Sequence, residues 1–317
     1  MSNRPQQRGF TLVEVLIALA LISAISLVAM GAITPWIGFK QKLDTERRLQ
    51  DVRNGMLAMY DRRAMEVEAQ VGGRFAEFTN SVPAPGIDGL PRCDSQMDAF
   101  ATNSMLFSEF PQQLSIDGYS NPWCIFISNP ILETRDNVQL WYRNIAVVSL
   151  GPDGVLEAGT ALTPAGVLSV AGDDLGVAVT GRDVQAPKLK DTLSRLNRVA
   201  QAYENFFTAR YLAYADRDIT RYYFADGGVA TSGNTWQPVG SWLAPVGVGG
   251  FDAATPWESN NTIEVNNGTG AANGTTVRTP WTSGSSALPY TALLRARVPT
   301  PPGAPVSYAL QVAVGNY

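Results

Sequence analysis

The feature that most constrains this chain is an apolar segment of membrane length near its N-terminus. Residues 10–33 carry a single charge, Glu14, and they follow a short leader that contains Arg4 and Arg8 and ends in Gly9. A helix of roughly 20 apolar residues is long enough to cross the hydrocarbon core of a bilayer. Placing a carboxylate inside such a segment costs several kcal/mol of free energy. We therefore expect Glu14 to have a partner and a functional role.

A secretory signal peptide and a plain membrane anchor are the alternatives for this segment. A signal peptide has an apolar core of about 7–15 residues and is cut at small residues that lie beyond it. Here the apolar run is longer, and the small residue that suits cleavage, Gly9, precedes it. A plain anchor would have no use for Glu14.

Type IV prepilins and pseudopilins begin with a motif that closely resembles the stretch Arg8-Gly9-Phe10-Thr11-Leu12-Val13-Glu14. The resemblance implies that a prepilin peptidase in the membrane cuts after Gly9 and that the new N-terminal residue, Phe10, is N-methylated. It also implies that the apolar helix first anchors the subunit in the inner membrane. The helix would later pack against other pilin subunits in the centre of a filament.

Glu14 has a physical role in this interpretation. It lies four residues after Phe10, so one helical turn separates it from the amine that cleavage frees. In a filament, the resemblance implies that staggered helices bring Glu14 of one subunit to the amine of the next. The low dielectric strengthens that attraction. Because Arg4 and Arg8 keep the leader cytoplasmic, we expect a single-pass inner-membrane protein with a periplasmic C-terminus.

Composition narrows the remaining functions. The net charge is −4, and it becomes −6 once the two leader arginines are removed. That is unfavourable for nucleic-acid binding, so no nucleic-acid partner is predicted. The chain contains no histidine, which excludes histidine-based triads and the usual catalytic zinc sites. With no catalytic motif present, we assign no enzymatic role.

The two cysteines, Cys93 and Cys124, are expected to form one disulfide in an oxidising periplasm. A pair of free thiols is the alternative, because the geometry of the two residues cannot be read from sequence.

Hydrophobic periodicity predicts an α+β fold with two helix-and-sheet domains, an arrangement that resembles the globular heads of pilins. Pro35 lies where the membrane helix is expected to end or kink, and a helical pattern then continues to about residue 70. The apolar face of this part is formed by Phe39, Leu43, Leu49, Val52, Met56 and Tyr60. This long N-terminal helix, membrane-spanning in its first half, would pack on an antiparallel sheet with strands at 123–127, 138–142 and 145–150.

The second half is expected to repeat this plan. A helix is predicted from Lys188 to about Leu212, with Pro187 at its start and a linker near 180–187. Strands follow at 288–298 and 306–314, and the polar stretch 259–276 is expected to form turns or an exposed loop. The predicted organisation is a leader at 1–9, a transmembrane helix at 10–35, a first domain at 36–183 and a second domain at 184–317.

Two turns in the first domain resemble turns of pseudopilins, and they are Asp117-Gly118-Tyr119-Ser120-Asn121-Pro122-Trp123 and Ser149-Leu150-Gly151-Pro152-Asp153-Gly154. Some pseudopilins bind calcium through acids that follow the second turn. The resemblance therefore makes Asp153, Asp173 and Asp174, with Glu157 between them, candidate calcium ligands. The alternative is that these are ordinary turn aspartates, and the long intervening segment favours it.

Four tryptophans mark the distal half, and they are Trp236, Trp242, Trp257 and Trp281. Exposed, they would form a carbohydrate- or surface-binding patch. The alternative, which we favour, is that they form the core of the second domain.

The predicted function is that of a minor pilin or pseudopilin at or near the tip of a filament, with a role in assembly initiation or surface binding. The reason is bulk, because a second domain of this size is hard to repeat along a shaft of closely packed helices. The alternatives are an anchored adhesin, a substrate-binding module and a pseudopilin of a type II secretion system.

Overall fold

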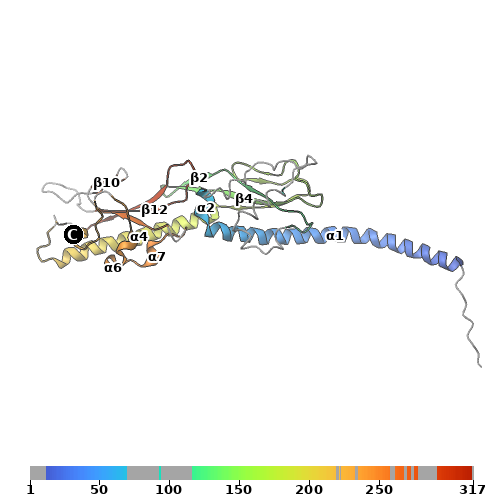
Figure 1. The fold of residues 1–317 in the computed structure, drawn as a ribbon, viewed down its shortest axis with the longest axis horizontal. Helices are drawn as coiled ribbons and strands as arrows, with labels where there is room; N and C mark the ends of the chain where they lie inside the picture. Colours follow the sequence, from blue (N-terminus) through green and yellow to red (C-terminus); the bar gives the residue numbers. More distant parts are fainter. Residues whose placement is uncertain are drawn as a thin grey trace, which may run out of the picture.

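The protein is elongated, with its two long helices arranged along one axis (Figure 1). The structure is a computed structural model, and the residues that it describes are 12–69, 93, 116–218, 221, 223–232, 235–257, 261–267, 270–272, 275–277 and 291–315, with the backbone alone for 27–34, 270–272 and 275–277. Helix α1 (Leu12–Arg62) projects beyond the rest of the chain at one end, and α4 (Arg182–Ala213) continues toward the other. Each helix packs on an antiparallel sheet, as the predicted α+β class requires.

Helix α1 differs from its prediction at two points. Its 51 residues include Pro35. The helix therefore does not end at this proline, which was one of the two outcomes predicted for it. It also stops at Arg62 instead of near residue 70, and a turn at Arg63 leads into the short helix α2 (Ala64–Ala69). Helix α2 leaves the line of α1 (Figure 1), and this change of direction buries Val67 and Glu68. The glycines predicted to stop the helix, at 72–73, lie outside the described residues.

Among the described side chains of α1, those that are buried lie in its C-terminal part, from Thr45 onward. Of the predicted apolar face, Leu49, Val52, Met56 and Tyr60 are buried. Phe39 and Leu43 are exposed instead, because the sheet begins to cover the helix only after them.

The first sheet has three strands in the order β1-β4-β7, all antiparallel. These strands are β1 (Cys124–Ile127), β4 (Asn144–Ser149) and β7 (Leu175–Thr180). One face, which includes Ile125 and Val147, packs on α1, and the other, which includes Phe126 and Val148, packs on a second apolar cluster. Burial on both faces explains why β1 and β4 are continuous apolar runs. These two strands were predicted and are confirmed, whereas β7 was not predicted.

Two hairpins complete this half. Strand β3 (Val138–Tyr142), which was predicted, pairs with β2 (Ile131–Arg135), which was not. Strands β5 (Ala161–Leu162) and β6 (Leu168–Ser169) form a smaller hairpin. The predicted disulfide between Cys93 and Cys124 is present, and both residues are fully buried against the outer face of β1.

The second half places α4 against a four-stranded antiparallel sheet in the order β13-β12-β9-β8. These strands are β8 (Gln237–Pro238), β9 (Glu264–Asn266), β12 (Thr291–Arg297) and β13 (Tyr308–Val314). Strands β12 and β13 confirm the predicted strands over the residues described. The short elements are α5 (Tyr223–Asp226), η3 (Val239–Trp242), α6 (Leu243–Val246), α7 (Gly250–Ala253), β10 (Gly270–Ala272) and β11 (Thr275–Val277).

The predicted linker near 180–187 is wrong. Strand β7 ends at Thr180 and α4 begins at Arg182, so Gly181 alone joins them and Pro187 lies inside the helix. A Cβ at position 181 would lie 2.4 Å from the carbonyl oxygen of Arg143. A larger residue would not fit at position 181. The two elements are therefore joined by one closely packed glycine and not by the predicted linker.

The two halves also share a core. The largest apolar cluster, formed mainly between α4 and the second sheet, includes Ala64 of α2 together with Val138 and Leu140 of β3. In addition, Ser307 Oγ donates a hydrogen bond to the carbonyl oxygen of Gln139 over 3.0 Å. The predicted boundary at residue 184 therefore falls within α4, in a region where both halves are in contact.

The polar stretch 259–276 was predicted to form turns or an exposed loop. This prediction is wrong for residues 264–267. Asn266 ends β9, and both Asn266 and Asn267 are fully buried. The side-chain amide of Asn267 accepts from the backbone N–H of Thr231 and donates to the carbonyl oxygen of Val229, each over 2.8 Å. Burial is tolerated because these bonds replace those that Asn267 would make with water.

Candidate functional site

The projecting part of α1 is the first candidate site. Its large apolar side chains between Leu12 and Ile25 have exposed fractions of 46–79%. Glu14 lies in the first turn of the helix and is also exposed. Contiguous apolar surface of this kind marks an interaction with protein or membrane. Gly9 and Phe10, the predicted processing residues, lie outside the described residues.

Within the described part of the chain, no helix combines the length and the apolar character that crossing a membrane requires. The prediction that residues 10–35 form a transmembrane helix is therefore not confirmed.

The second candidate site begins with a turn that is fixed to α1. A carboxylate oxygen of Asp117 accepts from the backbone N–H groups of Tyr119 and Asn121 over 2.9 and 2.7 Å. Gly118 donates its N–H to Thr45 Oγ1 of α1 over 3.0 Å, and a Cβ there would lie 2.3 Å from the carbonyl oxygen of Gln41. This turn needs a glycine at 118 because the helix backbone is in direct contact.

This turn holds the next one in place. Asn121 Nδ2 donates to the carbonyl oxygen of Gly151 over 2.6 Å, and Ser149 Oγ donates to Asp117 Oδ2. Asp117 is buried, and burial raises the pKa of its carboxyl group. The two turns that resemble pseudopilin turns are thus one hydrogen-bonded unit, and the second turn carries the predicted calcium ligand Asp153.

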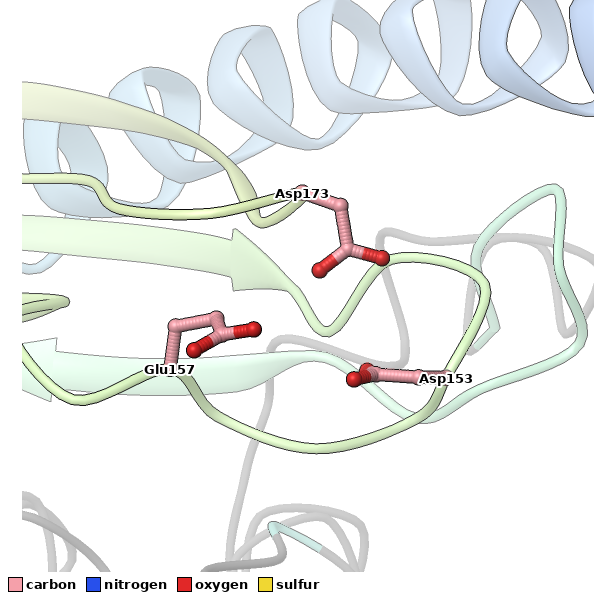
Figure 2. A group of neighbouring side chains, drawn as sticks. All are labelled: Asp153, Glu157 and Asp173. Carbon is pink, nitrogen blue, oxygen red and sulfur yellow. The ribbon is translucent and has the colours of Figure 1, made fainter.

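Three carboxylates converge beside this unit. Each of Asp153, Glu157 and Asp173 offers one oxygen, and these oxygens lie within 4.8 Å of one another. Figure 2 shows the three side chains pointing toward a common centre, with Asp153 and Glu157 on the loop after β4 and Asp173 on the loop before β7. Calcium binds oxygen at roughly 2.3–2.6 Å, so oxygens on opposite sides of one ion lie about 5 Å apart and this spacing fits it.

Two glycines leave the space that the carboxylates occupy. Gly151 has a φ of +64° and Gly172 a φ of +60°, and residues other than glycine rarely adopt such values. A Cβ at Gly151 would lie 2.8 Å from the carboxylate carbon of Asp173, and one at Gly172 would lie 2.5 Å from Cγ of Glu157. The arrangement of the acids therefore depends on both glycines.

Asp174, the third predicted ligand, lies outside this group of converging oxygens. Its side chain is buried, and Oδ2 accepts from the backbone N–H of Glu157 over 3.0 Å. Burial raises the pKa of Asp174, and the charges of Asp173 and Asp153 raise it further. Its Oδ1 has no hydrogen-bond partner among the described residues. Asp174 thus supports the loop on which Glu157 lies, and Glu157 takes its place in the group.

Two of the four tryptophans, Trp257 and Trp242, contribute to the main core, as the favoured interpretation predicted. Trp257 is 1% exposed and belongs to the main cluster. Trp242 is partly buried against the same cluster, and Trp236 is partly buried against Leu293. Trp281 lies outside the described residues.

A buried polar junction between the two halves was missed by the sequence analysis. Tyr60 donates its hydroxyl proton to Glu68 Oε1, and the backbone N–H of Arg143 donates to the same oxygen over 3.0 Å. On the other side, Trp257 Nε1 donates to Gln185 Oε1 over 2.7 Å. No local pattern marks these residues, because they come from α1, α2, the connection between β3 and β4, α4 and the distal half.

Residues 4–30 match the family model described as the prokaryotic N-terminal methylation motif. No curated protein and no solved structure matches the chain. The match supports the type IV prepilin and pseudopilin family, to which the same residues pointed. The match ends at residue 30. For the residues after it, we infer function from the structure.

Proposed function

We propose that this chain is a minor pilin or pseudopilin that assembles through α1 and presents both helix-and-sheet halves at or near the tip of a filament. The observation that carries the proposal is the projecting, exposed and apolar first part of α1 (Figure 1), together with the methylation motif at residues 4–30. The large apolar side chains of this part, between Leu12 and Ile25, are exposed. Neighbouring helices, first in the inner membrane and then in a filament, would cover them.

The proposal includes processing and topology. A prepilin peptidase would cut after Gly9, and the leader would stay cytoplasmic while the remainder is exported. The elongated arrangement of two sheets beyond α1 supports a tip position, because this bulk is hard to repeat along a shaft. The surface-binding and secretion alternatives share the same anchoring and differ only in the partner of the distal half.

Replacement of Glu14 by glutamine tests this proposal. If Glu14 pairs with the amine of a neighbouring subunit, loss of the charge costs about 3–5 kcal/mol, which lowers incorporation roughly 100-fold or more. The measurement is the amount of subunit that co-purifies with sheared filaments. Intact mass should show the same methylated N-terminus at Phe10 in both proteins, because the cleavage junction is unchanged.

Glu46→Gln is the matched control, since Glu46 is an exposed glutamate on the same helix. It should be incorporated normally. Normal incorporation of Glu14→Gln would contradict the role of Glu14 in assembly. A mature protein that still begins at Met1 would contradict the prepilin assignment itself.

We also propose that Asp153, Glu157 and Asp173 bind calcium. The proposal is supported by the converging oxygens and by the glycines that leave them room. The ion would tie the loop after β4 to the loop before β7. Those loops are joined to α1 through the Asp117 turn, so calcium would stiffen the half of the molecule closest to the filament.

Calcium is expected to stabilise the detergent-solubilised full-length chain. At a calcium concentration 100 times Kd, the gain is about 2.7 kcal/mol, which raises Tm by several degrees. Thermal denaturation with calcium and with EGTA measures the difference. Asp173→Asn should abolish it, whereas Asp136→Asn, at an exposed turn between β2 and β3, should retain it. An equal calcium response in wild type and Asp173→Asn, or none in either, would rule out this site.

A further inference from the structure

A cavity of about 370 Å³ lies on the face of the second sheet that is turned away from α4. Along β12, Leu294 and Ala296 point into the main core, so the alternating residues Arg295 and Arg297 lie on the opposite face. Arg297 is paired in register with Tyr308 of β13, and the cavity is lined by all three of these residues. Met65 of α2 closes one side. Its volume falls in the range of roughly 300–1,000 Å³ that small-molecule sites occupy.

Arg295 lines this cavity, and its side chain is held in place by its neighbours. Its Nε lies 2.6 Å from Glu264 Oε2 of β9, which balances its charge. Its guanidinium carbon lies 4.1 Å from the ring centre of Trp236 and 4.4 Å from that of Tyr308. An ion pair and stacking on two rings leave this side chain little freedom.

Arg297 is different, because its charge is not balanced locally. The residue is exposed, and among the described residues none forms an ion pair or hydrogen bond with its guanidinium group. Its carbonyl oxygen accepts from Asn261 Nδ2 over 2.8 Å, which fixes the backbone that carries it. A guanidinium group presents paired donors whose geometry matches a carboxylate.

The remaining lining defines the ligand. Asn261, Thr262 and Tyr308 offer amide and hydroxyl groups, and Met65 is the one apolar side chain among the lining residues. With Glu264 balancing Arg295, the cavity has one uncompensated positive charge. A phosphate dianion would meet the Glu264 carboxylate, and an apolar ligand would find little apolar surface. A ligand with several hydroxyl groups and one carboxylate satisfies every part of the lining.

We propose that this cavity binds a carboxylate-bearing sugar residue of an acidic polysaccharide, with Arg297 on the carboxylate and the neutral polar groups on the hydroxyls. The site lies in the half remote from the projecting part of α1 (Figure 1), so it stays accessible when α1 is occupied by other subunits. The proposal does not depend on the type of filament.

Isothermal titration of the full-length chain in detergent with an oligogalacturonate tests the proposal. The free acid should bind, and its methyl ester, which has the same sugar rings without the charge, should bind roughly 10- to 100-fold more weakly. Arg297→Gln should weaken binding of the acid by a similar factor. Arg135→Gln removes an exposed arginine from β2 in the other half and should leave the affinity unchanged.

Three results would overturn the proposal. They are the absence of oligogalacturonate binding, equal affinities for acid and ester, and equal weakening by Arg297→Gln and Arg135→Gln, which would mean diffuse charge attraction. Circular dichroism of each variant separates a loss of binding from a loss of fold.

Discussion

Replacing Trp257 with alanine is expected to lower the free energy of unfolding by about 3–5 kcal/mol, the usual range for truncating a buried tryptophan. Its side chain is 1% exposed and lies in the main core. Truncation leaves a cavity beside α4 and also removes the donor that serves Gln185 Oε1. Gln185 is fully buried, so its amide oxygen has no access to water as a substitute. Denaturation of the purified chain in urea measures the change.

Two further variants separate the causes. Trp257→Phe keeps most of the ring volume and removes the N–H donor, so it should cost about 1–3 kcal/mol, the penalty for an unsatisfied buried polar group. Trp242→Ala is the control within the same cluster, and because Trp242 is only partly buried its effect should be smaller. A Trp257→Ala variant as stable as wild type would contradict the role of this residue in joining α4 to the distal half.

Stability is expected to fall as the pH rises through neutrality, because of Glu68. Burial raises the pKa of this carboxyl group from 4.5 to about 7, although the Tyr60 hydroxyl and Arg143 act in the opposite direction. A raised carboxyl pKa means that the folded state favours the protonated form. The stabilisation is therefore fully present below about pH 4.5 and is lost as the pH rises through about 7. Its size is about 3 kcal/mol.

Measurements of unfolding free energy between pH 4.5 and 8 test this expectation. Glu68→Gln cannot titrate, so its stability should change less over this interval and should exceed that of wild type at the alkaline end. Glu66→Gln changes a partly exposed glutamate of the same helix and should keep the wild-type profile. If the Glu68→Gln and wild-type profiles coincide, Glu68 is not the titrating group.

The long elements and the covalent bond were predictable because their signals are local or chemically unique. The apolar run after Gly9 predicted a helix, and β1 and β4 were predicted because burial on both faces makes all of β1 and the middle of β4 apolar. Cys93 and Cys124 had no other cysteine to pair with. The turns at Gly118 and Gly151 were identifiable through their resemblance to pseudopilin turns, and the φ of +64° at Gly151 is a local requirement for glycine.

Which of the candidate acids converge could not be predicted, because this depends on how two loops pack. Glu157 joins Asp153 and Asp173, whereas the side chain of Asp174 is buried and accepts from the backbone N–H of Glu157.

The prepilin-type N-terminus and the α+β class could be predicted from residue types at short spacing, and the disulfide was the expected pairing because the chain has two cysteines. Which polar residues are buried depends on the complete fold. From the sequence, Asn267 was predicted to lie in a turn or an exposed loop. In the structure it is buried, and its side-chain amide is hydrogen-bonded to the backbone of Val229 and Thr231. Likewise, nothing in the sequence around Glu68 indicates that it is buried. In the structure it is buried and accepts hydrogen bonds from the Tyr60 hydroxyl and the backbone N–H of Arg143. Burial of a polar group is tolerated only when its partners are in place, and those partners are brought together by the completed fold.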